Sequence, residues 1–176
     1  SGSFSRAPVG RIVDAMNHLL SEHEGLFDPE QSDWDDFAYL PIRTLLLTGH
    51  NNHNWQYTSR VHAETLAATG RFIVTISDNP AQALTARADK PWQLYVLDYN
   101  DSQADKRWGD AAEKAFTRAV SEGAGVVAVH AANNAFKGWT EYESMLGLMW
   151  REGTGHGQFH TFTVSTVDAT DPIMAG

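Results

Sequence analysis

One stretch constrains the fold most: a run of small and β-branched residues that ends directly in a histidine. Residues 123–129 (GAGVVAV) lead into His130, and small or amide residues follow as far as Phe136. A short apolar run bounded by glycine predicts a buried strand of a parallel sheet with helices on both faces. A polar side chain at the carboxyl end of such a strand stands where α/β sheets bind ligands. In elbow enzymes this position holds a Ser or Cys nucleophile. Here it holds His130.

The remaining hydrophobic pattern alternates between strands and helices. Strands are predicted at 42–48, 72–76, 94–97 and 125–129, with a last one at 159–167, and helices at 58–68, 81–88, 105–121 and 141–150. This alternation predicts a three-layer α/β fold, flavodoxin-like or amidotransferase-like, with a parallel sheet between helices. An amphipathic helix at 8–24 places a helical extension at residues 1–40, ahead of the α/β domain at 41–176.

Composition excludes several classes of function. The 176 residues suit one α/β domain, and their net charge of −9 comes without any cluster of Lys and Arg, so nucleic acid is not an expected partner. The chain has no cysteine, which excludes thiol nucleophiles, disulfides and thiolate metal sites. No apolar run approaches the roughly 20 residues of a membrane span. We expect a cytoplasmic location, with a removed signal peptide as the alternative.

Polar residues gather directly after three of the predicted strands. They are residues 50–55 after the first strand, 98–100 after the third and 130–134 after the fourth. Because the carboxyl ends of parallel strands share one edge, these groups should converge on one site. A later glycine-rich stretch, 153–160, adds His156 and His160. It lacks the lysine and the helix start of a phosphate-binding loop, and no nucleotide cofactor is expected.

Each candidate also has a structural interpretation. His130 could be a packing histidine, although a purely structural residue there would more often be apolar. His50 and His53 could belong to a turn that caps the next helix. Asp98 could cap or pair with a neighbouring cation. Tryptophans more often pack in cores than bind sugars, but Trp55 and Trp139 lie beside the polar loops.

A metal site is a further alternative. His156 and His160 have a spacing that suits two ligands of one ion, and Glu141 or Asp98 could supply a third. The ion would be zinc or another divalent metal. No HExxH pattern supports this assignment, and histidines with carboxylates also serve as general acids and bases without a metal.

Four segments together resemble the trehalose-utilisation (ThuA-like) family. They are LLLTGHNNHNW at 45–55, VVAVHAA at 126–132, WTEY at 139–142 and GHGQFHTF at 155–162. The resemblance covers about residues 42–176 and implies a class I glutamine-amidotransferase-like fold without the amidotransferase cysteine. The residues it marks are His50, His53, Trp55, His130, Glu141, His156 and His160.

The resemblance further implies a role in sugar metabolism, on 3-keto derivatives of disaccharides or glycosides. Two departures accompany it. The first forty residues fall outside the resemblance, and family members continue past residues 171–173 through a further strand and helix. We therefore expect this chain to lack the C-terminal part of the fold.

The leading hypothesis is an enzyme that isomerises or cleaves a keto-sugar by proton transfer. His130, His53, Asp98 and Glu141 are its predicted catalytic residues, Trp55, Asn133 and Trp139 its substrate contacts, and His50, His156 and His160 its candidate metal ligands. The rivals are a non-catalytic carbohydrate-binding or regulatory module and a metal-dependent hydrolase. A small-molecule sugar is the expected partner, and Trp34 and Phe37 favour self-association into a homo-oligomer.

Overall fold

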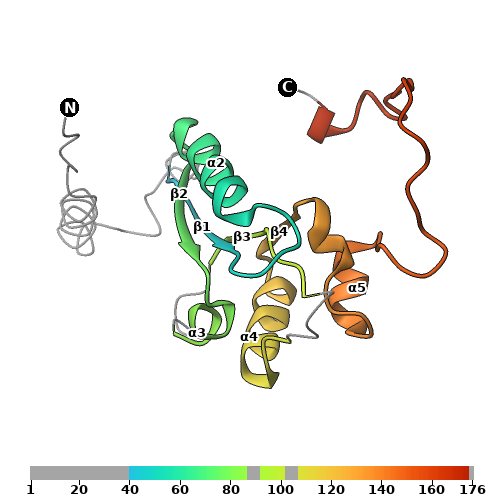
Figure 1. The fold of residues 1–176 in the computed structure, drawn as a ribbon. Helices are drawn as coiled ribbons and strands as arrows, with labels where there is room; N and C mark the ends of the chain where they lie inside the picture. The colour runs from blue at the N-terminus through green and yellow to red at the C-terminus, as the bar shows by residue number, and fades with distance from the viewer. Residues whose placement is uncertain (1–39, 87–91, 102–106, 175–176) are drawn as a thin grey trace, which may run out of the picture.

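Four parallel strands form the central sheet (Figure 1). The computed structural model describes residues 40–86, 92–101 and 107–174. The strands, in their order across the sheet, are β2 (Phe72–Ser77), β1 (Ile42–Leu47), β3 (Leu94–Leu97) and β4 (Gly125–Ala128). Every neighbouring pair is parallel. The predicted α/β fold with a parallel sheet flanked by helices is confirmed.

Helices separate the strands along the chain. They are α2 (Trp55–Ala68), α3 (Pro80–Thr85), α4 (Asp110–Ser121) and α5 (Thr140–Leu146), with 3₁₀ helices η2 (His130–Asn134) and η3 (Pro172–Met174). Two of them begin at an asparagine: Asn54 accepts a hydrogen bond from the Tyr57 N–H, and Asn79 accepts one from the Gln82 N–H. These bonds satisfy N–H groups that a helix start otherwise leaves unpaired.

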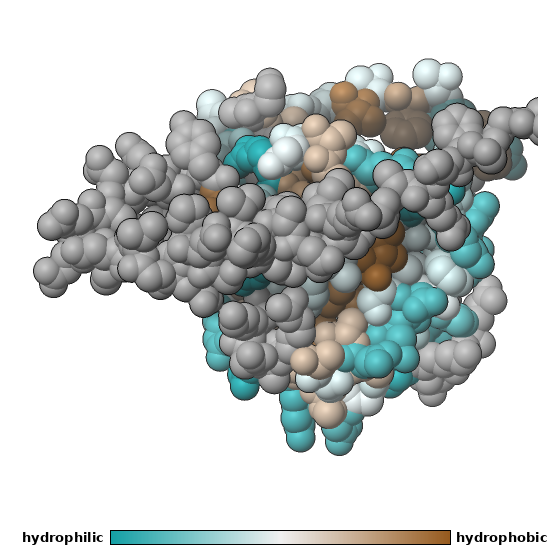
Figure 2. Space-filling view, turned by 90° about the vertical axis from the view of Figure 1, so that its left-hand side faces the viewer, coloured by the Kyte–Doolittle hydropathy of each residue, from teal (hydrophilic) through white to brown (hydrophobic). Residues whose placement is uncertain are grey.

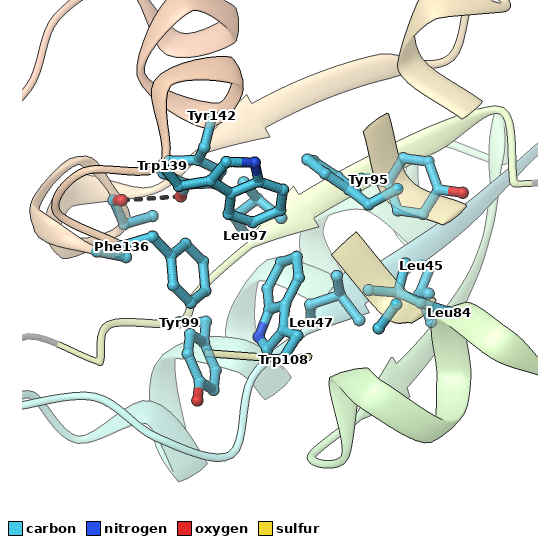
Figure 3. Close-up of a cluster of buried hydrophobic side chains, with 14 of the residues drawn as sticks. Leu45, Leu47, Leu84, Tyr95, Leu97, Tyr99, Trp108, Phe136, Trp139 and Tyr142 are labelled. Carbon is cyan, nitrogen blue, oxygen red and sulfur yellow. Dashed lines mark hydrogen bonds between the residues drawn. The ribbon is translucent and has the colours of Figure 1, made fainter. Parts of the chain in front are cut away.

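Aromatic side chains fill the space between the sheet and α3, α4 and α5 (Figure 3). The strands contribute Leu45, Leu47 and Leu97, and the rings around them are Tyr95, Tyr99, Trp108, Phe116, Phe136, Trp139 and Tyr142. Most of these rings meet edge to face; the Trp108 and Phe136 centroids, for example, are 4.7 Å apart at 71°. Such pairs contribute about 0.5–1.5 kcal/mol each beyond the burial of their area. This face therefore holds the hydrophobic core.

The opposite face of the sheet is covered by α2 and is more polar. Leu46 and Val96 alternate away from the aromatic cluster and are buried on this second face. Of the residues of α2, Ser59 alone is buried. A polar covering helix leaves room for polar side chains at the ends of the strands, which is where the candidate site lies.

The strand that precedes His130 lies at an edge of the sheet. We expected it to be buried between two helical layers, and that expectation is wrong. Among the described residues β4 pairs only with β3, and Val127 is 49% exposed. A short apolar run has the same sequence pattern at the centre and at the edge of a sheet, so the pattern did not separate the two cases.

The chain after α5 differs most from its predicted structure. The predicted helix at 141–150 ends at Leu146, where Gly147 follows with a φ of 73°. The predicted strand at 159–167 is not paired with the sheet; it belongs to an extended segment that leaves the domain (orange to red in Figure 1). Hydrophobic side chains of this segment are open to solvent, with Phe159 at 110% and Val167 at 102% relative exposure.

Hydrophobic side chains also reach the surface at the β2 edge of the sheet, where Ile76 is 44% exposed. Figure 2 looks at the side of the molecule that lies on the left in Figure 1, and hydrophobic atoms are visible there between hydrophilic ones. All but the last residue of the predicted extension at 1–40, including its helix at 8–24, and the predicted start of the helix at 105 lie outside the described residues. In the described part of the chain no helix combines the length and the apolar character that crossing a membrane requires.

Candidate functional site

The carboxyl ends of all four strands lie at one edge of the sheet. The last residue of β1, Leu47, is in register with Ser77 of β2 and with Leu97 of β3, and Leu97 is in register with Ala128 of β4. The helix after β1 covers one face of the sheet, and the helix after β3 covers the other (Figure 1). The edge between β1 and β3 is therefore a topological switch point, the usual place for a ligand in an open α/β sheet.

Hydrogen bonds fasten the loop after β1 to the end of β3. The Nδ1 of His50 lies 2.5 Å from the carbonyl oxygen of Asn100, and the Asn100 N–H donates to the carbonyl of His50 at 2.9 Å. The Asn100 side chain donates to that of Asn52 at 2.8 Å. A carbonyl oxygen can only accept, so Nδ1 of His50 carries the proton and Nε2 is left for other contacts. The two loops form one rigid polar edge.

Asp98 anchors this loop from within. Asp98 is 3% exposed, and its carboxylate accepts hydrogen bonds from Asn51 Nδ2 at 3.0 Å and from the Thr58 hydroxyl at 2.6 Å. Both oxygens are thus used by the histidine loop and by α2, and among the described residues no hydrogen bond joins Asp98 to a histidine. Asp98 is one of the predicted catalytic residues; the structure places it beneath the loop of His50 and His53, as a positioning group.

Gly49 brings this loop against the end of β2. Its φ is 105°, and a Cβ at this position would overlap the carbonyl oxygen of Asp78. Only glycine fits such a close approach of two backbones. The loops after β1 and β2 are consequently in direct contact at the residue that precedes His50.

His130 occupies a strained turn directly after β4. Its φ is 42°, a left-handed conformation that is uncommon for residues other than glycine. Nearby bonds hold the turn: the Tyr142 hydroxyl donates to the Ala132 carbonyl at 2.9 Å, and Asp101 accepts from the Phe136 N–H at 2.7 Å. Strain of this kind persists only where the surroundings enforce it, and it concentrates at functional sites.

Arg151 completes the support of this turn. Its guanidinium donates to the carbonyl oxygens of Asn134 at 3.2 Å and Ala135 at 3.0 Å, and it pairs with Glu143 at 2.6 Å. The hydrogen bond from Arg151 is the largest cause that lowers the pKa of Glu143 below its ordinary value.

Burial raises the pKa of Tyr142, and it raises that of Tyr99 to about 12, so both phenols stay neutral donors.

His53 and His130 come together across the edge. Their ring centroids are 4.8 Å apart at 51°. Both residues are exposed, and no side-chain hydrogen bond is formed by either ring within the described part of the chain. Two loops separated by more than seventy residues thus place a pair of open imidazoles at the carboxyl edge, as their positions after two strands predict.

A hollow lies beside His50, at the ends of β1 and β2. It has a volume of about 490 Å³ and is lined by Gly49, His50, Asp78, Asn79, Tyr99 and Arg107, among others. No side chain of the described residues bonds the exposed Asp78 carboxylate. The size falls within the range of small-molecule pockets, and the lining offers carboxylate, amide and imidazole groups to a polar ligand.

Two other predicted residues lie elsewhere. Glu141 is exposed and lines a groove with residues of α4, where it accepts from the Thr140 hydroxyl at 3.1 Å. No hydrogen bond of the described residues links it to a histidine, so the structure does not assemble it with the predicted catalytic group. Trp139 is 5% exposed and packs in the aromatic core (Figure 3), so a role as a sugar platform is corrected to a packing role.

The remaining substrate-contact candidates stay close to the edge. Trp55 begins α2 directly after the histidine loop and is half-buried. Asn133 belongs to η2, and its carbonyl accepts from the Trp150 N–H at 3.0 Å. Both keep their place as predicted contacts.

The predicted metal ligands are not assembled in this conformation. His156 and His160 are exposed on the segment after α5, with the His156 ring 4.8 Å from that of Trp150. Within residues 40–86, 92–101 and 107–174, no three His, Asp or Glu side chains are grouped so that they could hold one ion. The set His50, His156 and His160 is therefore not brought together.

Comparison with known proteins identifies the family. The model of the ThuA family, described as trehalose utilisation, matches residues 43–176. The chain belongs to the ThuA family. A crystal structure of a ThuA-like protein from Parabacteroides merdae ATCC 43184 is similar to it, with 39% identity and a TM-score of 0.55. The similarity covers 65% of this chain and 41% of that one, so the chain spans well under half of that protein. Curated proteins yielded no match.

Family membership confirms the resemblance seen in the sequence. Sequence reasoning nevertheless missed several residues that build the site, namely Asn51, Asn52, Thr58, Asn100, Asp101 and Arg151. The asparagines and acids stand in the loops that the strand ends marked, and this position was the available signal. Arg151 gives no signal of its own, because its partners at 133–135 belong to a separate turn.

Proposed function

We propose that this ThuA-family protein is an enzyme of sugar metabolism that acts on a 3-keto sugar or glycoside by proton transfer. The observation that carries the proposal is the pair of open imidazoles, His53 and His130, 4.8 Å apart at the switch-point edge. The family description, trehalose utilisation, supports a sugar as the substrate.

The chemistry suits this pair. A hydrogen on the carbon next to a carbonyl is acidic enough for a side chain to remove, and imidazole is the side chain that changes charge near neutral pH. One neutral imidazole would take the proton, and the C–H electron pair would move into an enolate. The other imidazole, protonated, would donate to the enolate oxygen.

Two outcomes follow from the enolate. Isomerisation results when the enolate oxygen takes up a proton, the hydroxyl group on the deprotonated carbon gives up its proton and becomes the new carbonyl, and the abstracted proton is added to the former carbonyl carbon. In a 3-keto glycoside, the enolate formed by removal of the C2 hydrogen can instead expel the oxygen substituent at C1, which leaves with its electron pair and takes up a proton. That second route is cleavage. Both need only acid and base groups, and Asp98 would serve by holding the His53 loop in place.

Replacement of His130 by asparagine tests the proposal. Asparagine tolerates the left-handed backbone at this position, so His130→Asn removes the imidazole while keeping the turn. We expect turnover of a methyl 3-keto-glucoside to fall by about 10²-fold or more, with the circular dichroism spectrum unchanged. His62→Gln, on α2, is the matched control and should keep full activity. Undiminished turnover in His130→Asn would remove His130 from the mechanism.

A second candidate is a non-catalytic carbohydrate-binding module. It is favoured by one observation: no carboxylate among the described residues orients His53 or His130, as a partner group orients the base in many enzymes. Ligand-observed NMR with a 3-keto-glycoside separates the two. Binding that is lost in His130→Asn, without any turnover by the unmodified protein, would select the binding module.

A further inference from the structure

The hollow beside His50 offers a ligand mainly hydrogen-bond acceptors. Nδ1 of His50 is committed to the Asn100 carbonyl, so the other nitrogen of the neutral ring, Nε2, can only accept. Asp78 lines the same hollow and is exposed. Its carboxylate forms no hydrogen bond or ion pair with a side chain in the described part of the chain. The polar groups that remain available in the hollow therefore suit a ligand that carries donors.

The charged groups of the lining disfavour an anionic ligand. The Asp78 carboxylate repels an anion, and Arg107, which also lines the hollow, is already bound to Glu113 at 2.8 Å. The amide oxygen of Asn79 accepts from the Gln82 N–H at the start of α3, so it too has a partner. Hydroxyl groups donate to a carboxylate without carrying a charge of their own, and the sugar substrate proposed above supplies them.

Apolar groups form another part of the lining. They are Pro80 and Ala81 in the first turn of α3 and the rings of Tyr99 and Trp108. Tyr99 and Trp108 are buried, with ring centroids 5.6 Å apart, and the core holds both rings in place (Figure 3). A sugar ring presents C–H groups as well as hydroxyls, so a fixed apolar wall beside a few polar groups suits it.

One loop connects the hollow to the imidazole pair. The loop after β1 contributes Gly49 and His50 to the hollow and His53 to the pair. Three residues of extended chain span at most about 11 Å, which limits the distance between the Cα atoms of His50 and His53. A substrate of two sugar rings is long enough to occupy both places.

We propose that the hollow is the subsite for the second ring of a disaccharide substrate. The keto ring lies at His53 and His130, its C1 substituent extends into the hollow, and the Asp78 carboxylate accepts hydrogen bonds from hydroxyl groups of that second ring. This inference rests on the reaction proposed above. It makes Asp78 a specificity-determining residue, because a two-ring substrate gains these hydrogen bonds and a methyl glycoside does not.

Turnover of two substrates tests the role of Asp78. Asp78→Ala should lower kcat/KM for 3-keto-trehalose by about tenfold or more and change that for a methyl 3-keto-glucoside by less than about twofold, because a hydrogen bond to a charged group is lost only with the two-ring substrate. Glu64→Ala removes another exposed carboxylate, on α2, and should leave both values unchanged. Equal losses with both substrates in Asp78→Ala, or no loss with either, would overturn the subsite.

A binding measurement separates a failure of the subsite from a failure of the proposed reaction. If the unmodified protein turns over neither substrate, the reaction fails, and titration with trehalose followed by the amide signals in NMR still tests the hollow. We expect the amides of Gly49, Asn79 and Ala81 to shift in the unmodified protein and in Glu64→Ala. Asp78→Ala, with an unchanged circular dichroism spectrum, should need about tenfold more trehalose or more for the same shifts. The subsite would be overturned if trehalose left these amides unshifted, or if it shifted them equally in Asp78→Ala.

Discussion

The two faces of the sheet are built by different means. The face toward α3, α4 and α5 is closed by interlocking rings, with Phe116, Phe136 and Tyr142 almost inaccessible to solvent. The face toward α2 is closed by polar contacts, among them Asp98 with Asn51 and Thr58. The hydrophobic effect that drives burial on the aromatic face has no preferred direction, whereas a hydrogen bond fixes the direction of its donor and acceptor groups.

The aromatic face therefore contributes mainly to the stability of the fold, and the polar face contributes mainly to the position of the site residues. The aromatic face supplies burial and dispersion, which dominate the free energy of folding. The polar face supplies little net free energy, since each hydrogen bond in protein replaces one to water. It instead holds the histidine loop at a defined place. Substitutions on the first face should lower stability most, and substitutions on the second should lower activity more than stability.

Phe116→Ala should have the largest effect on stability. Phe116 lies on α4, is fully buried, and contacts the rings of Tyr95, Trp108 and Trp139. Removing a buried ring leaves a cavity, and we expect a loss of about 3–5 kcal/mol in the free energy of unfolding. Urea denaturation measures it. A loss below about 1 kcal/mol, the range of surface substitutions, would contradict the assignment of the core to this face.

Gly49→Ala should be intermediate and should affect both properties. The added Cβ overlaps the Asp78 carbonyl, and alanine disfavours a φ of 105°. We expect about 1–3 kcal/mol of destabilisation and a fall in turnover, because the shift moves the loop of His50 and His53. Gly70→Ala is the control: its φ is also positive, at 71°, but no atom lies near its Cβ. If the two variants lose the same free energy of unfolding, the close contact between Gly49 and Asp78 does not contribute to stability.

Features of the fold that depend on local sequence pattern could be predicted from the sequence. Four strands, their helices and the convergence of residues 50–55, 98–100 and 130–134 follow from periodicity and from the rule that ligands bind at the carboxyl ends of strands. The pairing of His53 with His130 is a direct consequence of that rule.

The remainder depends on contacts between distant residues, which no local pattern encodes. Asp101 with the Phe136 N–H and Arg151 with the carbonyls at 134–135 join separate turns. The edge position of β4 and the burial of Trp139 likewise depend on what lies across the sheet. Sequence showed where the site would be, and tertiary contacts decided which residues support it.

Asp98→Ala tests the polar face directly. It removes acceptors for Asn51 and Thr58, and we expect a cost of about 1–3 kcal/mol because partly buried donors lose their partner. That is less than for Phe116→Ala. Turnover should fall further than stability alone explains, since His53 loses its support. The measurement is kcat at a temperature where the variant is fully folded. If the folded variant keeps the kcat of the unmodified protein, the hydrogen bonds of Asp98 contribute to the stability of the fold and not to the position of His53.

Glu143→Gln should give the smallest effect and one that depends on pH. Arg151 lowers the pKa of Glu143 below its ordinary value of 4.5, so the folded state binds this proton less readily than the unfolded chain. The stabilisation is therefore fully present above pH 4.5 and is lost as the pH falls toward the lowered pKa. The difference in Tm between the unmodified protein and Glu143→Gln should be constant from pH 5 to 7 and shrink below pH 4.5. A difference that stays constant or grows in acid would mean that the Glu143 carboxylate does not support Arg151, and that the turn after β4 is held by the carbonyl contacts of Arg151 alone.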